Sequence, residues 1–357
     1  MKALVLAGGS GTRLRPLSHS MPKQLVPVGD RPVLFHCLDA IGEAGITEVG
    51  VIVSVGPRGD EIRRAVGDGS AFGLRITCIP QDAPRGLADC VRLARPFLGD
   101  DDFVMYLGDN ILAGGIAAHA EEFRRTRPVA SVLLTRVDDP RSYGIAQLAG
   151  DGRVTRLWEK PAEPVGDLAL TGVYFFTPAV HEAVAAIRPS ARGELEITDA
   201  LSWLVDDGQD VRGEVFPGYW KDTGRIEDVL ECNRVLLDRL EADCRGLIDP
   251  DSVIVGNVVV EPGATVIRST LVGPVVVRAG TEIRDSHVGP YVTLGRDGVL
   301  DRAGITDSIV MDEVSVQDVR GIHGSLIGRQ ARVRQAAAPA SGHRLVLGDH
   351  TRIEVVA

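Results

Sequence analysis

Short apolar segments alternate with amphipathic segments over the first 128 residues of the chain. Runs of aliphatic residues predict buried strands, and apolar residues three or four positions apart predict helices between them. Strands are expected over 3–7, 49–55, 74–79 and from 102, and helices over 32–44, 60–66 and 87–95. This alternation is typical of an α/β fold with a mixed, mostly parallel sheet and helices on both faces, where ligands bind at the carboxyl ends of the strands.

Several strands are expected to follow one another directly between residues 129 and 176. Consecutive strands without helices between them predict an antiparallel insertion, here around a cleft of the size of a sugar. The final helix carries an apolar stripe and is predicted to close a first domain of residues 1–244. The strands are expected over 129–136, 145–148, 154–160, 168–176 and 211–216, and the helices over 178–187, 196–205 and 225–244.

The pattern changes completely after residue 248. Val-Gly pairs begin at residues 255, 272 and 288, and Ile254, Val260 and Val266 recur every six residues. A six-residue repeat with three repeats per coil is typical of a hexapeptide β-helix, in which each coil buries its aliphatic residues by stacking on the next. We therefore predict that residues 245–357 form a left-handed parallel β-helix. An ordinary β-sandwich is the alternative interpretation.

Composition narrows the classes of protein that fit these patterns. A chain of 357 residues, 44% of them hydrophobic, is long enough for two domains with a core each. Its formal net charge of −10 argues against a nucleic-acid surface, which needs excess Lys and Arg. No apolar run is long enough for a membrane span or a signal peptide. The five scattered cysteines suit a reducing compartment, so a cytoplasmic protein with neutral, packed thiols is expected.

The strand at 3–7 runs into a glycine-rich loop, Gly8-Gly9-Ser10-Gly11-Thr12-Arg13, and Pro22-Lys23 follows. Glycines directly after a strand let backbone N–H groups approach a phosphate, because no Cβ atoms intervene. The loop lacks the Gly-Lys-Ser/Thr ending of a Walker P-loop, and Leu14 stands where a dinucleotide fingerprint has its third glycine. The cations Arg13 and Lys23 suit a polyphosphate whose charge must be neutralised during reaction. A glycine-rich turn with solvated basic residues is the alternative.

These residues carry a family resemblance. The segments Gly-Gly-x-Gly-Thr-Arg-Leu-x-Pro and Pro-Lys-Gln-Leu-x-Pro, which begin at residues 8 and 22, resemble the signature loop of the sugar-nucleotide pyrophosphorylases. The Lys-Gln-Leu portion is most similar to the thymidylyltransferases that act on glucose 1-phosphate, and the β-helix extension resembles their longer form. The similarity runs from residue 4 to about 224. It implies a Rossmann-like nucleotidyltransferase domain that converts dTTP and α-D-glucose 1-phosphate into dTDP-glucose and diphosphate with Mg²⁺.

The resemblance also implies which residues bind the nucleotide and the metal. Gln81 and Gly86-Leu87-Ala88 are similar to a family element in which the Gln side chain and the glycine backbone contact the pyrimidine. Mg²⁺ usually binds through one or two carboxylates plus substrate phosphates. Asp109 and Asp222 match metal-binding aspartates of the family, although spacing alone would also allow a helix cap or turn residue at Asp109. The nucleotide set is Leu6, Gly8, Gly9, Gly11, Thr12, Gln81 and Gly86.

A further set of residues resembles the family's sugar site. Glu159 is expected to accept hydrogen bonds from sugar hydroxyls, and Lys160 to neutralise the attacking phosphate. An exposed, charged hairpin edge is the alternative interpretation of these two residues. Glu196 and Asp199 are expected to hold the start of the following helix. The sugar-phosphate set is Tyr143, Gly144, Glu159, Lys160, Thr171 and Arg192, and the catalytic set is Arg13, Lys23 and Lys160.

Nucleotidyl transfer to a sugar phosphate needs no covalent nucleophile, because the attacking phosphate oxygen is already ionised at neutral pH. Three alternatives stay open: a UTP-preferring uridylyltransferase, a non-catalytic regulatory subunit that binds sugar nucleotides, and acyl transfer at the β-helix through His287 or His323. Such regulatory subunits typically lose a loop cation or a metal carboxylate, and both are present here. A homo-oligomer is expected, with neither nucleic acid nor membrane as a partner.

Overall fold

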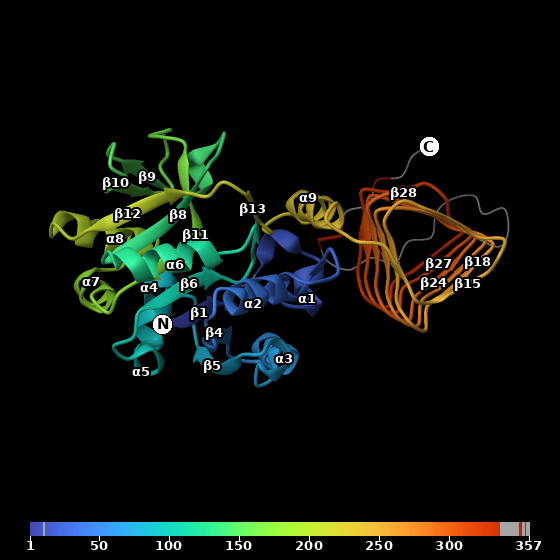
Figure 1. Cartoon of the computed structure of the whole chain (residues 1–357), viewed down its shortest axis with the longest axis horizontal. Coiled ribbons are helices and arrows are strands. Elements are labelled where there is room, and N and C mark those ends of the chain that lie inside the picture. The colour runs from blue at the N-terminus through green and yellow to red at the C-terminus, as the bar shows by residue number, and fades with distance from the viewer. Residues whose placement is uncertain (10, 336–349, 352–353, 355–357) are drawn as a thin grey trace. The chain divides into compact units, whose positions relative to one another are not determined.

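The computed structural model describes residues 1–9, 11–335, 350–351 and 354. They group into two compact units (Figure 1). The first unit consists of Met1–Ser10, Met21–Leu25 and Val33–Asp222, and the second of Gly11–Ser20, Val26–Pro32 and Thr223–Ala357. The glycine-rich loop is therefore divided between the units. The domain boundary after residue 244 stays a prediction.

A nine-stranded mixed sheet forms the centre of the first unit. Its parallel part contains β5 (Arg75–Gln81), β4 (Glu48–Ser54), β1 (Lys2–Leu6) and β6 (Phe103–Leu107), in that order. β1 and β6 are buried along nearly their whole length, as strands of a parallel sheet with both faces covered are. The predicted parallel sheet is confirmed, and its four strands end at one edge.

The strands predicted between residues 129 and 176 extend this same sheet. β11 (Leu168–Phe176) runs antiparallel to β6, β8 (Ala130–Arg136) and β9 (Gly144–Leu148). β10 (Val154–Glu159) pairs antiparallel with β9, and β12 (Val211–Val215) adds to β8 in parallel. The antiparallel strands are thus confirmed, and β11 joins them directly to the parallel part.

Helices cover both faces of the sheet (Figure 1). The first unit contains the helices α2 (Val33–Glu43), α3 (Pro57–Val66), α4 (Leu87–Leu93), α5 (Arg95–Leu98), α6 (Ala117–Thr126), α7 (Val180–Ala186) and α8 (Ile197–Asp206), and 3-10 turns at Lys23–Leu25, Ser70–Phe72 and Pro140–Ser142. On β11, Phe175 lies 5.5 Å from Phe123 of α6, measured between ring centroids. Phe176 instead lies 5.5 Å from Phe103, whose ring stacks on His181 of α7. Because neighbouring residues of a strand point to opposite faces, α6 and α7 cover different faces.

Three features of this unit differ from the prediction. The helix predicted over 87–95 is divided into α4 and α5, because Pro96 has no N–H to continue the first helix. The pattern does not predict α6, in which only His119, Ala120 and Phe123 are buried. It also does not predict the antiparallel pair of β7 (Asn110–Ala113) and β13 (Tyr219–Asp222), whose partners lie far apart in the chain.

The second unit contains two N-terminal segments and a helix besides the β-helix. The segments form a 3-10 turn at Thr12–Leu14, the helix α1 (Leu17–Ser20), and a hairpin of β2 (Pro27–Val28) and β3 (Arg31–Pro32). The helix α9 spans Ile226–Leu237. The helix predicted over 225–244 is therefore too long. The N–H groups of residues 239 and 240 bond to carbonyls three residues back, a tightening that is common where a helix ends.

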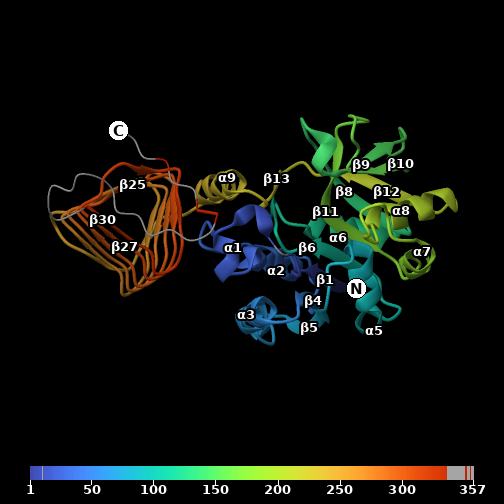
Figure 2. The same cartoon turned by 180° about the vertical axis from the view of Figure 1, so that it is seen from behind.

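Short strands then stack into three parallel sheets, drawn in orange and red in Figures 1 and 2. The first contains β14 (Asp243–Cys244), β17 (Val258–Val260), β20 (Val275–Val277), β23 (Val292–Leu294), β26 (Ser308–Val310) and β29 (Leu326–Ile327). The second contains β15 (Leu247–Ile248), β18 (Thr265–Ile267), β21 (Glu282–Arg284), β24 (Val299–Asp301), β27 (Ser315–Gln317) and β30 (Arg332–Arg334). The third contains β16 (Val253–Val255), β19 (Thr270–Val272), β22 (His287–Val288), β25 (Gly304–Thr306) and β28 (Ile322–His323).

The core of these coils follows the six-residue repeat. Val260 and Val266 are fully buried, in one cluster of aliphatic residues that continues through the stacked coils. Three parallel sheets confirm the β-helix against the β-sandwich alternative, and its left-handedness stays a prediction. Cys37, Cys90 and Cys232 are buried as expected, whereas Cys244 is exposed. No helix in the described part of the chain is long and apolar enough to cross a membrane.

Candidate active site

The carboxyl ends of β1, β5 and β6 meet at one edge of the sheet and line a pocket. Leu6, Gln81 and Leu107 are the last residues of these strands. The pocket is lined by Leu6, Gly8, Gly9, Lys23, Gln24, Gln81, Pro84, Gly86, Leu87, Cys90, Leu107, Asp109 and Glu194. The structure therefore brings the predicted nucleotide residues of the first unit together with Lys23 and Asp109. Gly11, Thr12 and Arg13 belong to the second unit, and their roles stay predictions.

Two glycines let the backbone approach closely at this pocket. A Cβ atom on Gly8 would lie 2.6 Å from Oε1 of Gln81, and one on Gly86 would lie 2.3 Å from the carbonyl oxygen of Leu195. Gly86 also has a φ of +103°, a conformation that favours glycine. Glycine therefore lets the loop pack against the Gln81 amide at Gly8 and against the backbone of Leu195 at Gly86.

The side chain of Gln81 is buried and bonded to the thiol of Cys90. Nε2 of Gln81 donates to Sγ of Cys90 at 3.3 Å, and Sγ donates to the carbonyl of Gly86 at 3.6 Å. Burial, followed by the neighbouring Asp89 carboxylate, raises the pKa of Cys90 to about 12, so the thiol keeps the proton that it donates. The sequence predicts only a neutral, packed thiol at Cys90. Its place one helical turn after Gly86 could have indicated the bond to the Gly86 carbonyl, but no sequence signal places Gln81 beside it.

Lys23, predicted to lie at the phosphates, and Asp109, predicted to bind the metal, form an ion pair. Nζ of Lys23 donates to Oδ2 of Asp109, and both side chains are largely buried, with 15% and 17% of their surface exposed. The Cε atom of Lys23 lies 3.3 Å from the position of a Cβ on Gly9. The two charges are therefore partly shielded from water. They interact more strongly in this environment than they would at an exposed site. An ammonium group suits phosphate oxygens, and a carboxylate suits a hard cation.

The sheet of β7 and β13 places Asp222 next to Asp109 in the fold. In its register Asp222 lies opposite Asn110, and Asp109 directly precedes Asn110. Oδ1 of Asp222 accepts a hydrogen bond from the hydroxyl of Tyr143 at 3.3 Å. The ring of Tyr143 in turn packs edge-on against Trp220, with centroids 5.5 Å apart. A sugar-site residue and both predicted metal ligands thus come together, although they come from three separate segments of the chain.

The donor atoms here suit Mg²⁺. Within the described ranges, no three His, Cys, Asp or Glu side chains gather as a metal site, so the predicted set stays at two carboxylates. The side-chain oxygen of Asn110 is buried and has no hydrogen-bond partner among the described residues. Mg²⁺ takes oxygen ligands, usually one or two carboxylates with substrate phosphates. Asp109 and Asp222 therefore fit this cation, whereas a transition-metal site would call for nitrogen or sulfur donors.

Glu159 is the centre of a second polar cluster, at the end of β10. Its Oε1 accepts from Nη1 of Arg192 at 3.1 Å and lies 3.3 Å from Nζ of Lys160. Its Oε2 accepts from the hydroxyl of Thr198 at 2.9 Å. Gly144 lies opposite Glu159 in the strand register, and a Cβ there would lie 3.5 Å from Oε2 of Glu159. Four residues of the predicted sugar-phosphate set therefore lie together or opposite one another.

Arg192 is surrounded by carboxylates. Besides Glu159, it pairs with Glu194 at 2.9 Å and with Glu196 at 3.7 Å. Glu196 occupies the N-cap position of α8, but its side chain accepts from the hydroxyl of Ser190 at 3.0 Å, so the expected side-chain cap at Glu196 is wrong. Asp199 lies in the first turn of α8, where a negative charge is favourable. The contact of Arg192 with a phosphate stays a prediction.

Thr171, also predicted for the sugar site, is fully buried. Its hydroxyl donates to the carbonyl of Leu133 at 3.0 Å, and its own carbonyl accepts from Nε1 of Trp220 at 2.7 Å. These bonds connect β11 to its neighbour β8 and to β13. A role of Thr171 in sugar binding stays a prediction.

Backbone hydrogen bonds connect the start of α4, next to Gly86, to the segment that contains Arg192. The N–H of Leu195 donates to the carbonyl of Arg85 at 2.8 Å, and the N–H of Ala88 donates to the carbonyl of Leu195 at 3.0 Å. Glu194, one residue earlier, lines the pocket. Glu194 and Leu195 are not among the predicted site residues, although both lie in the polar run that contains Arg192. The two clusters therefore share one supporting segment.

Comparison with known proteins identifies the family. The sequence pattern of the nucleotidyl transferase family matches residues 2–239, which include both polar clusters. The chain belongs to the nucleotidyl transferase family, and its fold and its pocket at the strand ends agree with that membership.

Individual relatives narrow the comparison. Glucose-1-phosphate thymidylyltransferases of Streptomyces griseus and Streptomyces antibioticus are 54% and 53% identical to this chain, and each alignment covers 99% of both chains. A crystal structure described as that of a glucose-1-phosphate thymidylyltransferase from Bacillus anthracis in complex with a sucrose has a TM-score of 0.63 and 34% identity. It covers 68% of this chain and 98% of the crystallised one.

Proposed function

We propose that this nucleotidyltransferase is a glucose-1-phosphate thymidylyltransferase, which converts dTTP and α-D-glucose 1-phosphate into dTDP-glucose and diphosphate. The proposal depends on the 54% identity, over 99% of the chain, to a relative of that name. The pocket supports it, because a buried amide on Gln81 suits a pyrimidine and the pair of Lys23 and Asp109 suits phosphates and a cation. The product is an activated sugar, as a first step toward dTDP-deoxysugars requires.

In the proposed reaction, a phosphate oxygen of glucose 1-phosphate attacks the α-phosphorus of dTTP in line, and diphosphate leaves. The attacking oxygen is ionised at neutral pH, so the protein needs no general base. Lys23 and Arg13 stabilise the charge on the transferred and leaving phosphates, and Lys160 orients the attacking phosphate. Glu159 accepts hydrogen bonds from sugar hydroxyls. Leu6, Gly8, Gly9, Gly11, Thr12, Gln81 and Gly86 bind the nucleotide, and Tyr143, Gly144, Thr171 and Arg192 complete the sugar-phosphate site.

Asp109 and Asp222 are the residues that would hold Mg²⁺. When bound, the cation would supply positive charge that offsets the negative charge of the phosphates. We expect EDTA to abolish turnover and added MgCl₂ to restore it.

The decisive test measures diphosphate release with glucose 1-phosphate and Mg²⁺ across dTTP, UTP, GTP, CTP and ATP. A kcat/KM for dTTP above that for every other nucleotide supports the proposal. Equal use of UTP would contradict the assignment of thymidine. A pocket that recognises the methyl group of thymine should discriminate against uracil by about 1–3 kcal/mol. Release with none of the nucleotides would contradict catalysis and favour a sugar-nucleotide-binding regulatory subunit.

The proposal extends to three properties of the whole chain: a catalytic domain over residues 1–244 followed by a β-helix domain over 245–357, a homo-oligomeric state, and a cytoplasmic location. The first two have direct tests. Limited proteolysis tests the domain boundary, and light scattering of the purified protein tests the oligomeric state.

A further inference from the structure

A short segment of the second unit directly follows the turn that carries Lys23. We name residues Val26–Pro32 the strap. It consists of β2, a turn at Gly29 and Asp30, and β3. Lys23 lies on the 3-10 turn Lys23–Leu25, so only two residues separate it from the strap. Any restraint on the strap therefore acts, through the chain, on the segment that carries Lys23.

Buried polar groups of the second unit hold the turn of the strap. The N–H of Gly29 donates to Oδ1 of Asn233 on α9 at 2.8 Å. The hydroxyl of Thr293 on β23 lies 2.9 Å from the carbonyl of Gly29 and 2.9 Å from Oδ1 of Asn233, and its proton serves one of the two. Asn233 is 1% exposed and Thr293 is 2% exposed. Hydrogen bonds at such depth are costly to lose, because the remaining groups have no water to bond.

Thr293 is a polar exception in an aliphatic column of the β-helix. In the strand registers it stacks between Val276 of the preceding coil and Ile309 of the following coil. This column lies outside the aliphatic core of the β-helix, to which the flanking residues Val292 and Leu294 belong. The partners of Thr293 are the strap and α9, which explains why this one coil carries threonine.

Two further contacts fix the same turn. Nη1 of Arg278 donates to the carbonyl of Asp30, while its Nε pairs with Glu261 at 3.1 Å. Gly29 has a φ of +65°, and a Cβ there would lie 3.0 Å from Cβ of Leu236 on α9. Two consecutive residues of the strap are thus held, and the fit against α9 requires glycine.

We propose that Thr293 and Asn233 are positioning residues for nucleotidyl transfer, because they hold the strap and so restrain the turn that carries Lys23. The inference rests on the function proposed above, and it gives the β-helix a role in the reaction. Lys23 acts on phosphate charge that develops during transfer, so looser positioning lowers kcat more than it raises KM.

Thr293→Val tests this, because valine keeps the shape, matches the neighbouring coils and removes only the hydroxyl. We expect kcat to fall about tenfold while KM for dTTP and for glucose 1-phosphate changes by less than about twofold, since small misplacement of a catalytic group costs this much or more. Thr293→Ser restores the hydroxyl and is expected to restore kcat. The matched control is Ser269→Ala, which removes a buried β-helix hydroxyl bonded to Ile267 and Ser286. It should leave kcat per folded molecule unchanged.

Hydrogen–deuterium exchange provides a readout that does not depend on activity. Thr293→Val should speed exchange in peptides covering residues 21–32, and Ser269→Ala should not. Wild-type kcat or unchanged exchange at residues 21–32 in Thr293→Val would overturn the inference, as would an equal loss of kcat in Ser269→Ala. A wild-type protein without diphosphate release would instead refute the proposed function. The exchange experiment would still show whether Thr293 restrains residues 21–25.

Discussion

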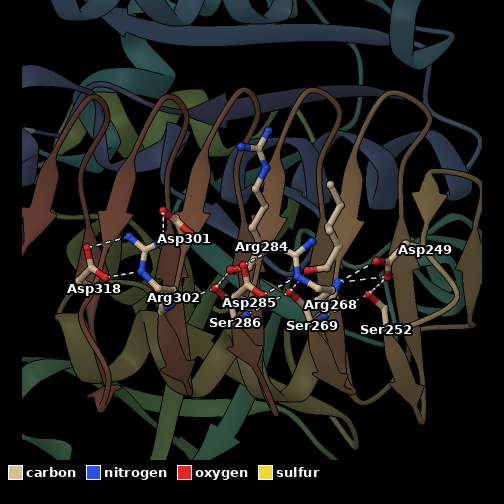
Figure 3. Close-up of polar contacts among 12 residues, drawn as sticks. Asp249, Ser252, Arg268, Ser269, Arg284, Asp285, Ser286, Asp301, Arg302 and Asp318 are labelled. Carbon is tan, nitrogen blue, oxygen red and sulfur yellow. Dashed lines mark hydrogen bonds and ion pairs between the residues drawn. The ribbon is translucent and has the colours of Figure 1, made fainter.

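The sheet of the first unit and the β-helix of the second use polar side chains in opposite ways. In the sheet, polar groups gather where strands end, and each differs from its neighbours, as Gln81, Asp109 and Glu159 do. In the β-helix, polar groups repeat from coil to coil. Ser252, Ser269 and Ser286 each accept a hydrogen bond from a backbone N–H of the next coil, at 2.9 to 3.1 Å (Figure 3).

Charged residues form a second column on the β-helix. Arg268 pairs with Asp285 of the next coil at 2.6 Å, and Arg302 pairs likewise with Asp318 (Figure 3). All four have φ between +43° and +56°, so they occupy equivalent turns. Polar groups that differ from place to place therefore indicate a binding site, whereas polar groups that repeat from coil to coil stabilise stacking. Thr293 matters because it breaks the repeat.

The largest loss of activity is expected at the strand ends of the first unit, where the polar groups do not repeat. Asp109→Asn and Asp222→Asn should each lower kcat by about a hundredfold or more, because each removes a negative ligand of the metal while keeping the size of the side chain. Circular dichroism should show an unchanged fold. Asp151→Asn, in an exposed turn of the same unit, is the control and should retain full activity. Near-normal turnover in either test variant would refute the metal assignment.

The next effect concerns stability and not turnover. Ser286→Ala removes a hydroxyl that bonds to the carbonyl of Arg284 and accepts from the N–H of Ala303. The carbonyl of Arg284 keeps its bond from the N–H of Arg302, but the buried N–H of Ala303 loses its partner, which should lower the free energy of unfolding by about 1–3 kcal/mol. Urea denaturation measures this, with Ser325→Ala, which removes an exposed hydroxyl, as the control. A loss of kcat per folded molecule would contradict a purely structural role of the serine column.

The sequence predicts best what local pattern determines. The glycine loop, Lys23 and Asp109 follow from residues adjacent in the chain, and the inward positions of the β-helix follow from a strict period. Pairings between distant segments leave no such local mark. The proximity of Asp222 to Asp109 depends on the register of β7 with β13, which no single segment of sequence records. Tertiary packing decides that register.

The same limit explains why the sequence does not reveal the partners of Thr293 and Cys90. Threonine at 293 is visible in the repeat as a departure from valine and isoleucine, but its partner Asn233 lies in another element. Cys90 looks like an ordinary apolar residue of a helix, and only the structure shows Gln81 beside it. A break in a pattern can therefore be recognised from sequence, whereas the group that the break serves cannot.

A smaller effect is expected for Cys90→Ala. Loss of one hydrogen bond, worth about 0.5–1.5 kcal/mol, leaves the Gln81 amide freer and should raise KM for dTTP about two- to tenfold. Because the pKa of Cys90 is about 12, the thiol stays protonated between pH 6 and 9, and the ratio of variant to wild-type KM should be constant over that range. The exposed Cys244→Ala is the control. A ratio that changes with pH would show that a thiolate takes part.

The smallest effect is expected in the charged column. Arg302→Ala should lower the Tm less than Ser286→Ala does, because exposed ion pairs contribute little and are screened by salt. The hydrogen bond that Asp318 accepts from Arg302 lowers the pKa of Asp318. Any stabilisation of the fold by this pair is therefore present above the ordinary Asp pKa and is lost as the pH falls through the lowered pKa. The Tm difference between wild type and Arg302→Ala should therefore shrink on acidification below about pH 4 and in high salt. A destabilisation as large as that of Ser286→Ala at neutral pH would contradict this expectation and show that the charged column contributes as much to the stacking of the coils as the buried serine column does.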